Sequence, residues 1–230
     1  MIIVLVVMAV PALSLLFLQN RQVQTRLSRY LTEQLAEELQ VPVSISSVNY
    51  SFFRRVQVKD LYIEDLNGDT LVHIGLTKLR IKQFRPEHKG LTIKKVTIED
   101  LFMNLVIDSS DVVNIQHFTN RIKNPHMPAE LKPRIHIASI DVIDSRFSLT
   151  KMGPKTARTP LTFNNFHLSD LQISVSNLEV ARDTVRMEVN SLHGIDISGF
   201  VFEKIITDMS ISRDHMHFYD VTALAGESDL

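Results

Sequence analysis

The chain has 230 residues, of which 44% are hydrophobic and 22% charged, so it is long enough for one large or two modest globular domains. Its formal net charge is -1, whereas nucleic-acid-binding proteins usually carry a basic excess, so we expect no nucleic-acid partner. The absence of Cys excludes a disulfide framework and any thiolate-ligated metal site.

Residues 1–18 form an uncharged segment in which Ser14 is the only polar side chain. A helix of this length spans about 27 Å, just enough to cross a hydrocarbon core of about 30 Å. A membrane helix also tolerates Pro11 better than a soluble helix does. The segment lacks the basic start and small-residue cleavage site of a signal peptide. We therefore interpret it as a transmembrane anchor, with a cleaved signal and a buried soluble helix as the alternatives.

The charges beside this segment leave its orientation open. Arg21, Arg26 and Arg29 follow the apolar run, and no basic residue precedes it. The positive-inside rule, applied to these charges alone, places the C-terminal side in the cytoplasm, whereas a basic stretch upstream would reverse that orientation.

Residues 19–41 predict an amphipathic helix. Its apolar residues recur every four positions, at Val23, Leu27, Leu31, Leu35 and Leu39, while the other faces carry Arg and Glu side chains. Pro42 ends the helix because its ring cannot continue the hydrogen-bond pattern. We favour a helix that packs on the rest of the domain; binding to a partner or a membrane surface needs the same amphipathic pattern and is the alternative.

After Pro42 the apolar period changes to two, which is typical of strands. A frame with apolar residues at positions 1, 3, 6 and 8 starts at Val56, Leu91, Ile135, Phe166 and, more weakly, Met216. On a regular strand, positions 1 and 3 share one face and positions 6 and 8 share the other. One extra residue near positions 4 and 5 restores a single apolar face.

Two local structures provide that extra residue, a β-bulge or a tight turn. The candidate positions are Lys59-Asp60, Lys94-Lys95 and Ala138-Ser139. A bulge bends a strand and raises its twist. Bulges at the same place in successive strands would curl the sheet into a gutter with one apolar face.

Plainer strands are predicted between these frames, with a hairpin turn at Asn67-Gly68 and a proline-containing surface loop over residues 120–133. These strands are Val43–Val48, Leu71–Ile74, Leu79–Phe84, Leu101–Ile107, Phe147–Leu149 and Val185–Val189, and a single helical turn is expected at Asn114–Phe118. The loop separates the first β units, residues 42–119, from further units, residues 134–230. The predicted fold is therefore mainly β: a transmembrane helix and an amphipathic helix followed by a curled, repeated β-sheet.

Asp65, Asn67 and Asp69 resemble the start of a calcium-binding loop. Such a loop needs Gly at its sixth position and Glu at its twelfth, where this chain has Thr70 and Leu76. Asn-Gly and Asp favour turns for their own backbone reasons, so we interpret the segment as a turn.

His215 and His217 would share one face of a strand, but the nearby Asp214 and Asp220 follow no known spacing of metal ligands. The chain contains no Gly-x-Ser-x-Gly, His-Glu-x-x-His or Walker motif. We therefore expect no catalytic residues, no metal and no cofactor, and we do not expect an enzyme.

Seven stretches, taken in order, carry a resemblance to a known family. They are Phe17–Asn20, Leu27–Leu31, Val41–Val48, Val58–Asp65, Gly68–Leu71, Val113–Phe118 and Ile197–Phe200. Together they resemble the N-terminal region of the AsmA-like family, specifically the TamB (translocation and assembly module) branch of the type found in Bacteroidota.

The resemblance implies a β-groove that holds lipid acyl chains in a protein that runs from the inner toward the outer membrane. It implies phospholipid transfer or outer-membrane assembly, with membrane lipids and an outer-membrane β-barrel assembly protein as partners. It also implies a single-pass inner-membrane protein with residues 19–230 in the periplasm, of which this chain is the membrane-proximal end. The alternative function is a structural scaffold that docks assembly machinery through exposed strand edges.

If the repeated frame lines an apolar groove, nine side chains are expected to contact lipid. They are Val58, Leu61, Ile63, Ile93, Val96, Ile98, Ile137, Ile140 and Val142. A closed core would use the same residues, and the strand pattern alone leaves open which face they share.

Overall fold

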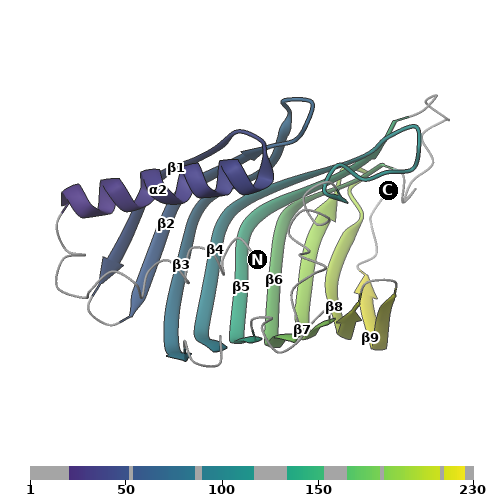
Figure 1. Ribbon diagram of the computed structural model, residues 1–230. Helices are drawn as coiled ribbons and strands as arrows, with labels where there is room; N and C mark the ends of the chain where they lie inside the picture. Colours follow the sequence, from purple (N-terminus) through teal and green to yellow (C-terminus); the bar gives the residue numbers. More distant parts are fainter. Residues whose placement is uncertain are drawn as a thin grey trace.

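In the computed structural model, the described residues are 21–51, 54–85, 90–116, 134–152, 165–181, 184–212 and 215–225. They form a helix, α2 (Arg21–Leu39), and a curved sheet of nine strands that lie side by side in chain order (Figure 1). The strands are β1 (Val43–Ser51), β2 (Arg55–Glu64), β3 (Thr70–Arg85), β4 (Gly90–Ile107), β5 (Arg134–Lys151), β6 (Asn165–Ala181), β7 (Thr184–Asp196), β8 (Val201–Ile211) and β9 (Met216–Ala225).

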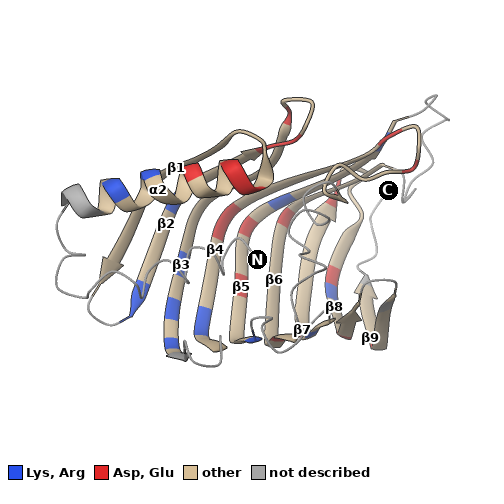
Figure 2. Ribbon diagram, in the orientation of Figure 1, with Lys and Arg blue, Asp and Glu red and all other residues tan. Residues whose placement is uncertain are grey.

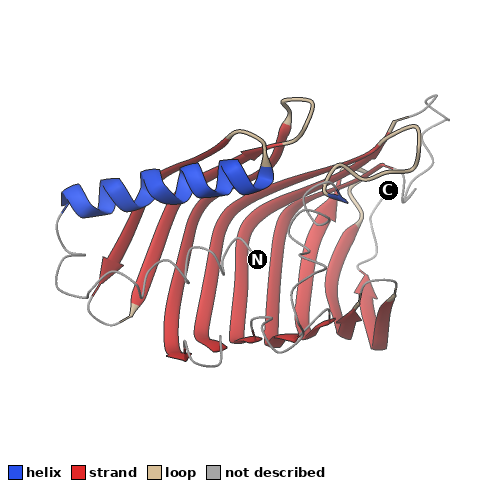
Figure 3. Ribbon diagram, viewed as in Figure 1, coloured by secondary structure: helices blue, strands red, loops and turns tan. Residues whose placement is uncertain are grey.

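Neighbouring strands are antiparallel except for β4 and β5, which are parallel. The sheet is open, with β1 and β9 at its edges. Figure 3 shows a single layer of strands with α2 lying beside the β1 end of the sheet. The mainly β class predicted from the sequence is confirmed.

Several strands predicted as separate elements are halves of one long strand. β3 contains both Leu71–Ile74 and Leu79–Phe84, and β4 continues from the frame at Leu91 through Leu101–Ile107. β5 likewise joins the frame at Ile135 to Phe147–Leu149. The apolar pattern changes phase inside these strands because the backbone bends there without reversing. The tight-turn alternative is therefore wrong, since β2, β4 and β5 each continue as one strand through the three candidate positions.

A β-bulge occurs at the second of those positions. Arg80 pairs with Lys95, whereas Ile81 pairs with Ile93, which leaves Lys94 as an extra residue in β4. The bulge predicted at Ala138-Ser139 is absent, because β5 keeps its register there with both β4 and β6.

Aspartates with positive φ mark a row of bends across the sheet. Asp60, Asp100, Asp144 and Asp170 have φ of 50°, 55°, 50° and 47°. Asp is one of the few residues with a Cβ that adopts this left-handed conformation. Gly75 lies between Asp60 and Asp100 in the same row, and a Cβ on it would approach Asp100 Oδ2 to 3.0 Å. The bulge predicted at Lys59-Asp60 is absent, because β2 keeps its register there with both β1 and β3. The positive φ of Asp60 bends the strand instead.

Helix α2 forms where the sequence predicts the amphipathic helix. Leu27, Leu31, Leu35 and Leu39 are buried and belong to the same apolar cluster as residues of β1 to β5. The helix ends at Gln40, whose φ of 56° and N–H bond to Ala36 O (2.8 Å) satisfy a terminal carbonyl. The favoured interpretation, a helix packed on its own domain, is confirmed for these leucines.

The hairpin between β2 and β3 is confirmed as a turn closed by a carboxylate. Asp65 is buried, and its Oδ1 accepts hydrogen bonds from Asn67 N (2.8 Å) and Asp69 N (3.0 Å). Gly68 takes the φ of 85° that the turn requires. The calcium-loop residues therefore serve the backbone of the turn itself.

The predicted anchor, residues 1–18, and the predicted surface loop, residues 120–133, lie outside the described residues. The helical turn expected at Asn114–Phe118 is described only as far as Gln116. Among the described residues, no helix combines the length and the hydropathy of a membrane span.

Candidate functional site

Strand register brings the nine predicted lipid-contacting residues onto one face of the sheet. Directly opposed residues on neighbouring strands share a face. One row runs from Val58 through Thr77 and Ile98 to Val142. Val96 opposes Ile140, and Ile93 opposes Ile137. The bend at Asp60 returns Leu61 and Ile63 to the face that carries Val58, as their burial shows. We call this surface the apolar face.

Near α2 the apolar face is the core of the domain. Six of the nine residues are buried in the cluster that also contains the α2 leucines: Val58, Leu61, Ile63, Ile93, Val96 and Ile137. Val96 and Ile93 are 0% exposed. Val142 is buried too, while Ile98 and Ile140 are partly buried and pack against the cluster. The closed-core alternative thus describes the packing of Val96 and Ile93 within this chain.

The apolar face continues across β6 to β9 along the same rows. Ile140 opposes Val175, Val175 opposes Val189, and Val189 opposes Thr207. Nearer the start of β7, Met187 opposes Met209, which in turn opposes Phe218 of β9. Val175, Val189 and Thr207 are buried, whereas Phe218 and Val221 on β9 are 53% and 59% exposed.

Phe218 and Val221 were missed as site residues by sequence reasoning, although a signal for them exists. They occupy positions 3 and 6 of the weak frame that starts at Met216. Asp220 between them has a φ of 50°, like the aspartates at the bends of β2, β4, β5 and β6. The frame was therefore sufficient to place them on the apolar face, but not to show that they are exposed.

Four phenylalanines pack together along β5, β6 and β8. The ring centroids of Phe147 and Phe166 are 6.4 Å apart, those of Phe166 and Phe202 are 5.8 Å apart, and those of Phe200 and Phe202 are 4.9 Å apart. All three pairs are edge-to-face, which suits the ring quadrupoles. Phe147 opposes Met103, which opposes Val72 on the apolar face. The group extends the apolar face toward the turn at residues 196–200.

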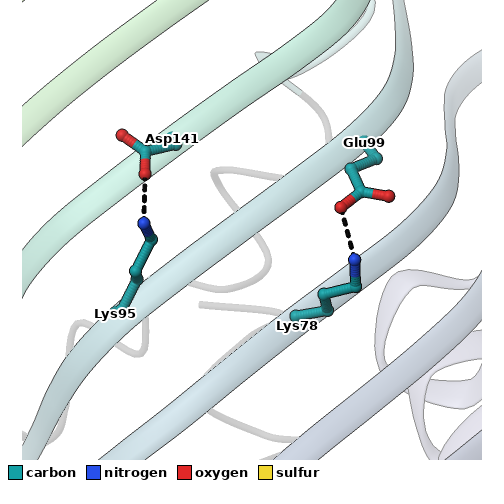
Figure 4. A network of polar contacts seen from close by, with 4 residues as sticks. All are labelled: Lys78, Lys95, Glu99 and Asp141. Carbon is teal, nitrogen blue, oxygen red and sulfur yellow. Dashed lines mark hydrogen bonds and ion pairs between the residues drawn. The ribbon is translucent and has the colours of Figure 1, made fainter.

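The opposite face of the sheet is polar. Lys78 pairs with Glu99 at 2.5 Å, and Lys95 pairs with Asp141 at 2.8 Å, both between neighbouring strands (Figure 4). Arg146 lies over the ring of Phe102 at 5.3 Å from its centroid. A sheet with one apolar and one charged face keeps its solvated side soluble while the other side buries apolar groups.

Asp196 is the titratable group with a perturbed pKa among the described residues. Burial raises its pKa, but hydrogen bonds from Ser198 Oγ (2.7 Å), Ser198 N (3.0 Å) and His167 N (3.3 Å) outweigh that effect. The net result is a pKa below the ordinary value. This carboxylate closes the turn between β7 and β8, as Asp65 closes the turn between β2 and β3. Asp196 therefore stabilises the turn.

The two histidines considered as metal ligands stack on one side of β9. The rings of His215 and His217 lie 5.8 Å apart, and those of His217 and Tyr219 lie 6.1 Å apart. Within the described residues, no group of three or more His, Cys, Asp or Glu side chains is placed to hold a metal.

Comparison with models of known protein families gives no match, and comparison with curated proteins gives none either.

Proposed function

We propose that this chain is the membrane-proximal part of a non-enzymatic cell-envelope protein that carries phospholipid acyl chains along the apolar face of its sheet. Residues 1–18 anchor it in the inner membrane, and the sheet extends into the periplasm. The observation that carries the proposal is the continuity of the apolar face from the buried core under α2 to the exposed Phe218 and Val221.

The energetic reason concerns the exposed end of that face. Burying a methylene group contributes about 0.8 kcal/mol, so a long acyl chain gains substantially from any apolar surface it can follow. Phe218 and Val221 provide such surface on β9, next to the partly buried Met209 of β8.

The polar groups of the sheet support a role without catalysis. The buried carboxylates Asp65 and Asp196 accept hydrogen bonds within their own turns and from Asn114 Nδ2 and His167 N, respectively. The charged side chains of Figure 4 pair with one another on the face opposite the apolar one. Lipid transfer requires a continuous surface and no reacting group, which agrees with this arrangement.

Neighbouring residues on β9 offer a matched test of the proposal. A photo-crosslinking amino acid would replace Phe218 on the apolar face in one variant and Tyr219 on the opposite face in another. Their exposed fractions, 53% and 52%, are nearly equal. After ultraviolet irradiation of full-length protein in inner-membrane vesicles, mass spectrometry should find phospholipid attached at position 218 and little at position 219. Equal attachment at both positions, or none at either, would overturn lipid transfer along this face.

The scaffold alternative has one observation in its favour, the edge strand β9. Within the described part of the chain β9 pairs with β8 alone, so its outer edge presents unpaired backbone groups to a partner strand. Lipid analysis of the detergent-washed protein separates the two functions. Stoichiometric phospholipid supports transfer, whereas lipid-free protein that retains a β-barrel partner supports the scaffold.

A further inference from the structure

Basic side chains gather at one end of strands β2 to β5. Figure 2 shows them at the lower ends of these strands, while acidic side chains lie toward the other end. We call this cluster the basic end; it consists of Arg54, Arg55, Arg80, Lys82, Lys94, Lys95 and Arg134, all exposed. The described residues 54–59, 78–85, 90–98 and 134–140, which surround it, contain no Asp or Glu.

The pairing of the strands concentrates these charges. Arg55 directly opposes Arg80, and Arg80 directly opposes Lys95, so three cations lie in one row. Like charges in direct opposition destabilise a sheet. Lys95 also pairs with Asp141 (2.8 Å), and Arg54 Nη1 donates to Lys82 O (2.7 Å), while no acidic residue lies in the row itself. Despite this repulsion the basic residues lie together, as expected for a surface that binds an anionic partner.

Acidic groups occupy the opposite end of the same strands. The turns that follow β2 and β4 contain Asp65, Asp69, Asp108 and Asp111, and Asp196 is the last residue of β7, which ends on the same side of the sheet. Helix α2 repeats the polarity, with Arg26 and Arg29 in its first half and its glutamates in the second (Figure 2). The chain is close to neutral overall, at net charge -1, but among the described residues of β2 to β5 the basic and acidic groups gather at opposite ends.

The anionic partner that fits is a phospholipid surface. The uncharged segment 1–18 directly precedes α2 in the sequence, and the first half of α2 carries the exposed Arg26 and Arg29. Clusters of basic residues beside a membrane segment are attracted to anionic headgroups over roughly one Debye length. A near-neutral protein with acidic ends elsewhere is poorly suited to follow a nucleic-acid backbone.

We propose that the basic end lies against the anionic headgroups of the membrane that holds the anchor, and so sets the direction in which the sheet leaves the bilayer. This inference depends on the proposed membrane location but not on lipid transfer along the apolar face. It predicts that the turn at residues 65–69 points away from the membrane while the starts of β2 and β4 face it.

The chain contains no Cys, so single-cysteine labels report one position each. Gln83→Cys places a donor dye at the basic end, and Asn67→Cys places one in the turn at the far end; both side chains are exposed. The full chain is reconstituted in discs of phosphatidylcholine, with or without phosphatidylglycerol, that carry an acceptor dye on lipid headgroups. Energy transfer should be several-fold stronger from position 83 than from position 67 in discs with phosphatidylglycerol. Raising salt to about 1 M should abolish most of the difference, because the Debye length falls to about 3 Å.

Charge reversal separates the basic end from net charge. Arg80→Glu with Lys94→Glu should lower energy transfer from position 83 to the level in discs of phosphatidylcholine alone. Arg146→Glu with Lys204→Glu makes the same change of charge at exposed positions on β5 and β8, in the half of the sheet away from the basic end, and should leave the transfer unchanged. Thermal melting of both variants checks that each still folds.

Equal transfer from both labels, no dependence on phosphatidylglycerol, or equal effects of the two charge reversals would overturn the inference and leave the cluster for another kind of partner. Lipid crosslinking at position 218 reports the proposed function separately. Its loss with headgroup proximity intact would reject the transfer function alone.

Discussion

Two regions of the sheet share a backbone plan but differ in what covers them. Strands β1 to β5 and strands β6 to β9 both carry apolar rows and aspartates with positive φ. Under α2 the rows belong to a core in which Val48, Val56, Ile93 and Val96 are 0% exposed. At β9 the same pattern leaves Phe218 and Val221 more than half exposed. The repeated frame therefore gives a bent strand with one apolar face, and the neighbouring elements determine whether this face is buried or exposed.

The largest expected effect comes from introducing a charge into each region. Val96→Glu buries a carboxylate without a partner at a 0% exposed position and should lower the free energy of unfolding by about 4 kcal/mol or more. Val221→Glu on β9 should change it by no more than about 0.5 kcal/mol. Ile140→Glu, at a partly buried position, should fall between them. Urea unfolding of the three variants measures the ranking, and a stable Val96→Glu protein would contradict the core assignment.

Removing the helix contact sharpens the same distinction. Leu35, which is 1% exposed, packs in the cluster shared with β1 to β5, so Leu35→Ala should cost about 2–5 kcal/mol. Tyr30→Ala on the exposed side of α2 should cost less than about 1 kcal/mol. Hydrogen exchange should show the loss of protection first in β1 to β3. Protection lost first in β8 and β9 would mean that α2 does not stabilise the covered region in particular.

A smaller loss of stability is expected at Gly75, which lies between the bends at Asp60 and Asp100. Gly75→Ala places a Cβ 3.0 Å from Asp100 Oδ2 and should cost about 1–2 kcal/mol by overpacking. Asp100→Gly removes the obstructing side chain, and glycine readily adopts the φ of 55° at that position. The double variant should therefore recover most of the loss. Strictly additive free energies of unfolding in the four-protein cycle would show that the two residues do not interact.

The smallest effect concerns pH in the β6–β9 region. Because the pKa of Asp196 is lower in the folded protein than in the unfolded chain, its carboxylate stabilises the fold above the unfolded pKa. That contribution is lost as pH falls through the folded pKa. Asp196→Asn should therefore lower stability at neutral pH and lessen the further loss between about pH 5 and 2. Parallel urea titrations at both pH values measure this, and an unchanged pH dependence would assign the acid sensitivity to other groups.

Local sequence patterns predicted the helix and the turn because the deciding interactions lie close together in the chain. Leucines every four residues give a helix with one apolar stripe, and Asp65 closes its own turn through Asn67 N and Asp69 N. The spacing of apolar residues around Lys94 likewise predicted a bulge that the register of β3 and β4 confirms. The sequence did not show that two predicted strands form one long strand. The apolar residues change phase in the same way whether the strand bends or the chain reverses in a turn.

The sequence by itself determined that one face of these strands is apolar, since side chains alternate along a strand and each extra residue restores the phase. Only the tertiary structure decided how that face is used. Strand order brings Val58, Ile98 and Val142 into one row, and α2 covers the β1 end of the sheet but not β9. It also decided that Arg55, Arg80 and Lys95 meet in one row, because their separation along the chain contains no information about register. Burial and the opposition of like charges depend on which distant segments become neighbours, and that is a property of the folded sheet.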